Sequence, residues 1–354
     1  MSDSPPVSRA IDDLEIAPPI RQAVLEQLIA ALDSYVFPEI ARRIQQDVRD
    51  RLASDGYSDV TAGRQLADTL TAQLQALSQD PQLRLHFSPQ RLPTLEPAVK
   101  PAPDDLERQR RLSSLRNFDF NRVERLRGNV GYIQLFGFEP PEFAGDTAAA
   151  AMNFVAHTQA LIFDLRHNSG GAPAMVALLC SYLLPAYPSV HLNDLYWPQT
   201  EETRQWWSLP YVAGQRYVDK SVFVLTSPET ASAAEEFAYN LQVLKRATIV
   251  GETTRGGANP GRGHRLHDHF WMFIPSGRAI NPITHTNWHG SGVVPDAKVP
   301  SELALNTAHL IALNQLLETA TGSHRRELEA AAQAVDKELQ QQRQDLISRL
   351  GGTV

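Results

Sequence analysis

Apolar residues recur at helical spacing through residues 18–85, which is the pattern of amphipathic helices. Pro18 and Pro19 open the first helix, because proline is tolerated in the first helical turn. A second helix begins near Pro38 and ends before Asp55, and a third ends before Asp80. The apolar positions are Ile20, Val24, Leu25, Leu28, Ile29 and Leu32, then Ile40, Ile44, Val48 and Leu52, then Leu66, Leu70, Leu74 and Leu77. Three such helices joined by short loops predict a small helical domain over residues 1–87.

From residue 128 the pattern changes to short apolar runs that alternate with helical segments. The runs predict buried strands at 130–136, 160–165, 221–225, 247–250 and 270–274. Helices are expected at 147–158, 174–187 and 233–244. This alternation predicts an α/β sheet with helical crossovers over residues 128–310. Further helices are expected over residues 311–354, and the last one, at 325–350, is polar enough to face solvent or a partner.

Residues 88–127 differ from both neighbouring regions, because prolines alternate with charged residues there. This composition predicts a linker with extended stretches. The basic residues between Arg108 and Arg116 are interpreted as a solvated face, with a phosphate contact as the alternative.

The composition limits the classes of function. The chain has 354 residues, of which 42% are hydrophobic and 21% charged, as in a soluble protein of two or three domains. Its net charge of −7 argues against a general binder of nucleic acid or anionic membranes. No apolar stretch reaches the roughly 18 residues of a membrane span, and no signal-peptide pattern is present, so a cytoplasmic protein is expected. Cys180, the single cysteine, is interpreted as a buried hydrophobe.

Two stretches at predicted strand ends carry residues for acyl chemistry. Residues 164–171 (Asp-Leu-Arg-His-Asn-Ser-Gly-Gly) end in a glycine pair, Gly170 and Gly171, whose N–H groups could hold an oxyanion or a phosphate, although most such pairs are only turns. Ser232 stands at the start of a predicted helix, where developing negative charge is favoured. Ser232 and Glu235 also match a capping box, and this pattern alone favours a helix cap by about two to one.

Two further glycine-rich stretches and a group of histidines follow. Residues 250–261 lack the Gly-Lys-Ser/Thr ending of a nucleotide P-loop, which excludes that function. Residues 286–296 read Thr-Asn-Trp-His-Gly-Ser-Gly-Val-Val-Pro-Asp. His267 and His269 share a strand face, but no HExxH motif or Cys/His framework accompanies them. We therefore expect no metal site and no cofactor, and we interpret the histidines as polar residues near a pocket mouth.

Together, in this order, the four stretches resemble the tail-specific (C-terminal processing) serine peptidases and their relatives, the tricorn protease core and interphotoreceptor retinoid-binding protein. The resemblance rests on Asp-Leu-Arg-x-Asn-x-Gly-Gly, Thr-Ala-Ser-Ala-Ala-Glu, Val-Gly-Glu-Thr-Thr and Gly-Val-x-Pro-Asp, and covers roughly residues 18–310. It implies a crotonase-like spiral of ββα units behind a separate N-terminal helical domain. No stretch is long enough for the PDZ domain of typical processing peptidases.

By this resemblance Ser232 is the nucleophile. The N–H of Ala233 or of Ser232 itself, together with that of Gly170 or Gly171, would form the oxyanion hole.

The resemblance does not supply a general base. The processing peptidases use a lysine where this chain has Gly257, and no lysine lies between Lys245 and Lys298. Tricorn-like relatives use a histidine and a glutamate at the positions of Gln134 and His289, and the retinoid-binding branch commonly has histidine at the position of Asn259. We hypothesise that His289 or His285 acts as the base instead.

Two functions follow. The first is a serine-type endopeptidase or amidase that acts on a peptide or protein and binds an extended chain, with its C-terminal end as one option. The second is a catalytically degenerate member of the fold that binds a peptide or an apolar ligand, for which Trp197, Trp206 and Trp207 are candidate wall residues, with a hydrophobic anchor as their alternative role. The intact nucleophile and glycine pair favour the peptidase. The C-terminal helix could pair with a second copy.

Overall fold

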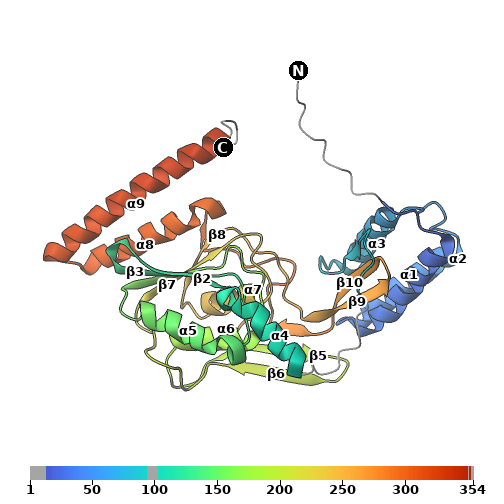
Figure 1. Ribbon diagram of the computed structural model, residues 1–354, viewed down its shortest axis with the longest axis horizontal. Coiled ribbons are helices and arrows are strands. Elements are labelled where there is room, and N and C mark those ends of the chain that lie inside the picture. The colour runs from blue at the N-terminus through green and yellow to red at the C-terminus, as the bar shows by residue number, and fades with distance from the viewer. Residues whose placement is uncertain (1–12, 94–102, 350, 352–354) are drawn as a thin grey trace. The chain divides into compact units, whose positions relative to one another are not determined.

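The computed structural model describes residues 13–93, 103–349 and 351 (Figure 1). Residues 1–12 of the expected helical domain and residues 94–102 of the expected linker lie outside the described residues. The described chain divides into two compact units. Unit 1 contains residues 13–93, 197–202 and 259–278, and unit 2 contains the rest.

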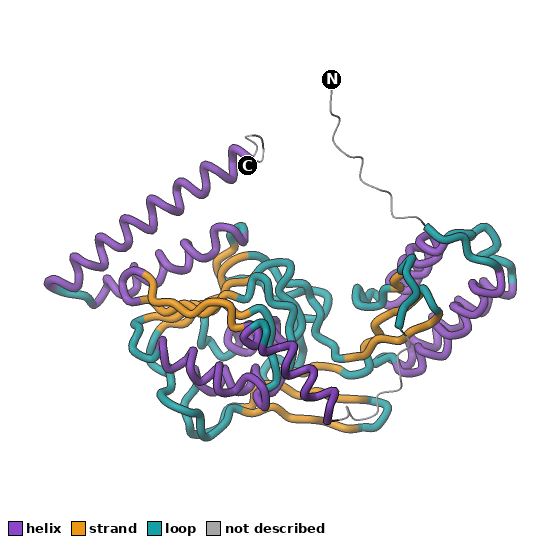
Figure 2. The backbone as a smooth tube through the Cα atoms, in the orientation of Figure 1, coloured by secondary structure: helices purple, strands orange, loops and turns teal. Residues whose placement is uncertain are grey.

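Unit 1 confirms the three amphipathic helices, which are α1 (Pro18–Ala31), α2 (Pro38–Ala53) and α3 (Gly63–Ser78). Their apolar faces enclose a core with Val24, Leu28, Ile44, Leu70 and other buried residues. The helices pack on an antiparallel sheet of order β1-β10-β9, shown in Figure 2 as strands beside helices. These strands are β1 (Leu85–Phe87), β10 (Phe270–Pro275) and β9 (Gly261–His267).

The strand expected at 270–274 therefore exists, but it is not part of the α/β core as predicted. It forms β10, whose buried Phe270, Met272 and Ile274 complete the core of the helical unit. Period-two burial identifies a strand but says nothing about which sheet it joins.

Unit 2 is built on a six-stranded sheet of order β12-β8-β7-β4-β3-β2. Strands β3, β4, β7, β8 and β12 pair in parallel, as predicted for strands with helical crossovers. The strands are β2 (Phe120–Leu126), β3 (Val130–Leu135), β4 (Ala160–Asp164), β7 (Ser221–Thr226), β8 (Thr248–Gly251) and β12 (Ala297–Lys298).

Helices cover both faces of this sheet (Figure 1). Crossover helices α5 (Pro141–Val155), α6 (Pro173–Leu183) and α7 (Ala233–Val243) follow β3, β4 and β7. On the other face α8 (Ala304–Thr319) packs against β4, β7 and β8, and α9 (Gly322–Arg349) packs on α8. Parallel strands place all their following loops at one edge of the sheet, so the motifs after β3, β4, β7 and β8 gather there.

The segment expected to be a linker, residues 88–127, contains regular structure. Helix α4 (Pro103–Ser114) begins at one of its prolines, and β2 is the outer strand of the sheet, antiparallel to β3. Strand β2 has two polar or charged residues between its apolar Phe120, Val123 and Leu126. Charged residues are common on edge strands, so the composition of β2 resembles that of a loop.

The insert before β7 also holds structure that the sequence did not predict. Strands β5 (His191–Trp197) and β6 (Glu202–Trp207) form a hairpin that pairs with β11 (Arg278–Ile280). Short 3₁₀ turns complete the chain at Leu32–Ser34, Asn117–Asp119, Arg127–Asn129 and Ser301–Leu303. Among the described residues, no helix is both long and apolar enough to cross a bilayer.

Candidate active site

Ser232 is exposed at the N-cap of α7, directly after the turn that follows β7. Its backbone has φ 55° and ψ −124°, a region that residues other than glycine rarely adopt. Such strain persists only where the surrounding contacts hold it, and it is common at active sites. The turn therefore presents the hydroxyl at the carboxyl edge of the sheet.

The glycine pair after β4 lies against this serine. A Cβ atom added to Gly170 would come within 2.7 Å of the Ser232 Cβ and 3.0 Å of the Ala233 nitrogen. The Ala231 N–H also donates to the Asn168 carbonyl oxygen at 3.0 Å. The structure thus brings the two predicted stretches into direct contact.

The hydrogen bonds around the serine distinguish the four predicted oxyanion donors. The Gly170 N–H donates to the Asn168 Oδ1 at 2.9 Å, and the Ser232 N–H donates to the Glu235 Oε2 at 2.8 Å. Among the described residues, no acceptor is recorded for the N–H of Gly171 or of Ala233. Gly171 is also exposed, with φ 140°. The oxyanion hole therefore stays a prediction, for which the N–H groups of Gly171 and Ala233 are the remaining candidates.

Glu235 joins the nucleophile turn to the glycine-rich loop after β8. Its fully buried carboxylate accepts the Ser232 N–H and, on the same oxygen, the Gly257 N–H at 2.9 Å. The other oxygen accepts from the Thr254 hydroxyl and the Gly256 N–H, both at 2.6 Å. This is the carboxylate half of the predicted capping box. The hydroxyl half is present as well, with the Ser232 side chain facing the Glu235 N–H. Ser232 therefore completes the predicted capping box and is at the same time exposed.

Gly257, the position of the family lysine, lies beside Ser232, since one oxygen of Glu235 accepts both N–H groups. His289 lies in the loop that contacts this region, where the Gly290 N–H donates to the Gly256 carbonyl oxygen at 2.9 Å.

His285 lies in a different turn. The neighbouring Thr284 hydroxyl contacts the Tyr239 hydroxyl at 3.0 Å, about two helical turns along α7 from Ser232. The geometry therefore places the His289 loop nearer to the serine than His285, and the role of either as a base stays a prediction.

A buried ion pair anchors the start of the glycine-pair loop. Asp164 receives two hydrogen bonds from the Arg166 guanidinium, at 2.9 and 2.7 Å, and one from the Tyr132 hydroxyl at 2.7 Å. Burial by itself would raise the pKa of Asp164, but the bonds and charge of Arg166, with the Tyr132 bond, hold it below its usual value. Gln134, at the position of the tricorn histidine, donates to the same carboxylate at 3.3 Å.

The sequence did not single out three polar side chains at this edge. Asn168 orders the glycine pair through its Oδ1 and donates to the Leu135 carbonyl oxygen at 2.8 Å. His167 pairs with Glu229, with 2.8 Å between Nδ1 and Oε2. Asn168 and Glu235 belong to the family-like motifs and could have been found there, whereas no local signal relates His167 to Glu229.

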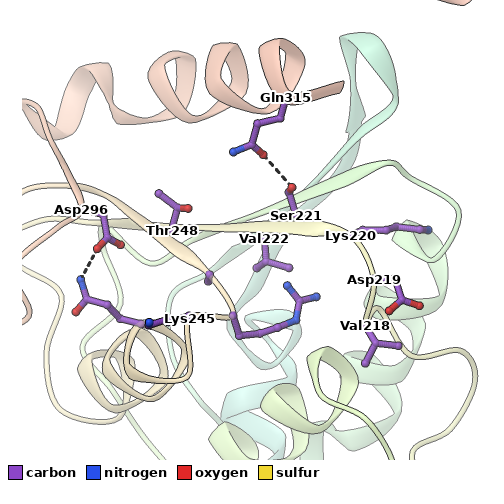
Figure 3. Close-up of a pocket in the computed structure, with 12 residues that line it drawn as sticks. Val218, Asp219, Lys220, Ser221, Val222, Lys245, Thr248, Asp296 and Gln315 are labelled. Carbon is purple, nitrogen blue, oxygen red and sulfur yellow. Dashed lines mark hydrogen bonds between the residues drawn. The ribbon is translucent and has the colours of Figure 1, made fainter. Parts of the chain in front are cut away.

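A separate cavity of about 620 Å³ lies at the opposite edge of the sheet, where β7 and β8 begin (Figure 3). Two cationic side chains of this cavity bind backbone carbonyl groups. Lys220 donates to the Ala156 carbonyl oxygen at 2.7 Å, and Arg246 donates to the Leu183 carbonyl oxygen at 2.6 Å. These carbonyl groups end α5 and α6, where positive charge is favourable. This cavity is therefore distinct from the serine site.

The sequence also named other candidate ligand groups. Among the described residues, no three His, Cys, Asp or Glu side chains are placed to hold a metal ion. His267 and His269 lie in unit 1. Trp207 stacks on His191, with 4.3 Å between ring centroids. Cys180 is fully buried, and burial raises the pKa of its thiol.

Comparison with known proteins identifies the family of the chain. The model of peptidase family S41 matches residues 129–299, and the model of the N-terminal domain of peptidase S41 in eukaryotic IRBP matches residues 11–117. The chain therefore belongs to peptidase family S41, the family of tail-specific and C-terminal processing proteases.

Particular relatives are more distant. The chain is 28% identical over 175 residues to the carboxyl-terminal-processing protease of Synechocystis sp., which covers 49% of this chain and 39% of that protein. It is 32% identical over 103 residues to the tail-specific protease of Haemophilus influenzae, covering 28% of this chain and 13% of that protein. The chain thus spans well under half the length of these relatives.

A candidate peptidase from Parabacteroides merdae has a similar solved structure, with a TM-score of 0.54 and 16% identity over 79% of this chain and 90% of that one. At this identity, the likeness concerns the fold alone.

Proposed function

We propose that this protein is a serine peptidase that hydrolyses peptide bonds, with Ser232 as the nucleophile. The observation that carries the proposal is the contact between the Ser232 turn and the glycine pair. It is supported by the exposure of Ser232 and by the N–H groups of Gly171 and Ala233, for which the described residues supply no acceptor. Two converging backbone donors are what a tetrahedral oxyanion needs.

The chemistry follows from this arrangement. The Ser232 Oγ attacks the peptide carbonyl carbon while its proton passes to a base, and the carbonyl electron pair moves onto the oxygen held by Gly171 and Ala233. Collapse of this intermediate breaks the C–N bond, and the amine leaves with a proton. Water then releases the acyl group from the serine. The base is His289 in our proposal, because its loop contacts Gly256, with His285 as the alternative.

The substrate is proposed to be an extended peptide or protein, as the names of the relatives suggest for those proteins. The C-terminal end of a peptide is the segment to test first as a substrate. We also propose that unit 2 is a crotonase-like ββα spiral. Two copies of the chain are proposed to pair through their C-terminal helices.

The direct test is labelling of the purified protein with a fluorophosphonate, followed by peptide mapping. We expect the label on Ser232 and none on the Ser232→Ala variant. Ser221→Ala is the matched control, since Ser221 is exposed at the opposite edge of the sheet on the strand that leads to Ser232. Loss of peptide hydrolysis should accompany loss of labelling.

If wild-type protein neither labels nor hydrolyses any peptide, the peptidase proposal fails. Binding of a peptide or apolar ligand without turnover would then assign the chain to the second function, a degenerate member of the fold. His289→Ala and His285→Ala identify the base: the variant that lowers hydrolysis without lowering thermal stability names it.

A further inference from the structure

Three exposed side chains form a row at the carboxyl edge of the sheet, one from each loop after β3, β4 and β7. They are Phe136, His167 and Glu229, and we call them the edge row. The Phe136 and His167 rings meet edge to face, with 6.3 Å between centroids and 77° between planes. The His167 Nδ1 lies 2.8 Å from the Glu229 Oε2. Phe136 is 37% exposed, and the other two side chains are more than half exposed.

The edge row lies beside the nucleophile, because the same two loops carry both. Along these loops the His167–Glu229 contact is followed by the Ala231–Asn168 hydrogen bond and then by the contact between Gly170 and Ser232. An extended peptide advances about 3.3 Å per residue. A peptide whose carbonyl carbon sits at Ser232 can therefore bring a side chain a few residues away onto the edge row.

The chemistry of the row suits a long cationic side chain. Lysine and arginine have apolar stems that pack on aromatic rings, and Phe136 and His167 offer such surface. Their charged heads pair with carboxylates, and Glu229 has only the His167 imidazole as a partner among the described side chains.

The charged groups around the edge row favour a cationic side chain. Asp119 and Glu139 lie near Phe136 and share one guanidinium, that of Arg116, at 2.9 and 3.1 Å. On the other side, the exposed Arg255 makes no ion pair with Glu229 among the described residues, and only its N–H contacts this loop, at the Thr230 carbonyl oxygen.

We propose that Phe136, His167 and Glu229 form a subsite that selects a lysine or arginine side chain of the peptide. The inference rests on the proposed function where it is tested by peptide cleavage. A second test measures peptide binding and does not require cleavage. The selected residue lies within a few positions of the scissile bond.

The experiment compares peptides that differ only in placing Lys, Gln or Glu at each position around a cleaved bond. Wild type is expected to cleave the best Lys peptide about tenfold faster in kcat/KM than the matching Glu peptide, as for a partly exposed charged pair. Glu229→Gln should remove most of this preference, and Glu229→Lys should reverse it. Glu318→Gln, an exposed change on α8, should leave the preference as in wild type.

The same peptides are titrated against Ser232→Ala protein, with and without Glu229→Lys, by fluorescence anisotropy. A preference for Lys peptides that reverses with Glu229→Lys supports the subsite even if no cleavage occurs, in which case only the peptidase proposal fails. Equal binding of Lys and Glu peptides, or cleavage whose preference is unchanged by Glu229→Gln, overturns the subsite and leaves the peptidase proposal standing.

Discussion

Gly170 lies so close to Ser232 that a methyl group on the glycine would come within 2.7 Å of the serine Cβ. Its φ of 106° is also a conformation that side chains disfavour. The loop after β4 can therefore approach the nucleophile turn only because this position has no side chain. This approach brings the glycine pair against the Ser232 turn, which is what the proposed oxyanion hole requires.

Replacing Gly170 by alanine tests that approach. We expect Gly170→Ala to lower stability by about 1–3 kcal/mol from backbone strain, with more from the clash. Labelling of Ser232 should fall at least tenfold, because the loops separate. The control is Gly145→Ala in α5, where an added Cβ meets nothing within 4 Å. There alanine should stabilise the helix by up to about 1 kcal/mol. Denaturant unfolding and labelling rates measure both. Normal labelling of the Gly170→Ala variant would contradict our assignment.

The Glu235 carboxylate is expected to be essential for order at the site. Glu235→Gln keeps the shape but places an NH₂ group against N–H and O–H donors, so at least two buried hydrogen bonds are lost. We expect a stability loss of about 2–4 kcal/mol, together with loss of Ser232 labelling. Glu318→Gln, an exposed change on α8, is the control at pH 7. Urea unfolding decides the matter, and two equally stable variants would disprove the role.

Glu236 should make the stability of the protein fall with rising pH. Burial raises the pKa of this carboxyl to about 8, against a smaller opposing effect of Asn193. The unfolded chain ionises near pH 4.5 while the folded chain holds its proton, so stability is highest below that pH. It should fall by up to about 1.4 kcal/mol per pH unit until about pH 8 and then level off.

Glu236→Gln should remove this dependence. The variant is expected to match wild type near pH 4.5 and to be more stable at pH 8.5. Thermal melts at pH 5, 7 and 8.5 measure the difference, with Glu318→Gln as the exposed control. Parallel curves for wild type and Glu236→Gln would show that Glu236 is ionised in the folded protein.

A lysine at position 257 should raise activity. The Gly257 N–H shares the Glu235 Oε2 with the Ser232 N–H, so a side chain at position 257 starts close to the Ser232 turn. We expect Gly257→Lys to increase hydrolysis about 10–100-fold, more at high pH where the amine is deprotonated. Gly257→Met has similar length without the amine and should give no increase. Equal rates for the two variants would mean that the base is not limiting.

Short stretches of sequence were enough to predict several helices, the parallel strands and the residues of interest. Helices α1 to α3 follow from apolar residues such as Val24, Leu28 and Leu70, and the parallel strands follow from runs such as residues 160–164. These signals are local, because helical and strand periodicity act over a few residues. The family-like motifs likewise identified Ser232 and the glycine pair as the residues of interest.

The tertiary structure alone decided how these residues are used. Asn168 accepts the Gly170 N–H and Glu235 accepts the Ser232 N–H, so Gly171 and Ala233 are the candidates that remain for the proposed oxyanion hole. It also placed β10 in the helical unit. Hydrogen bonds and sheet membership depend on pairs of groups that are distant in the chain, and no local pattern specifies which partner a donor finds. The sequence therefore determined which groups are present, and packing determined which of them remain open to a substrate.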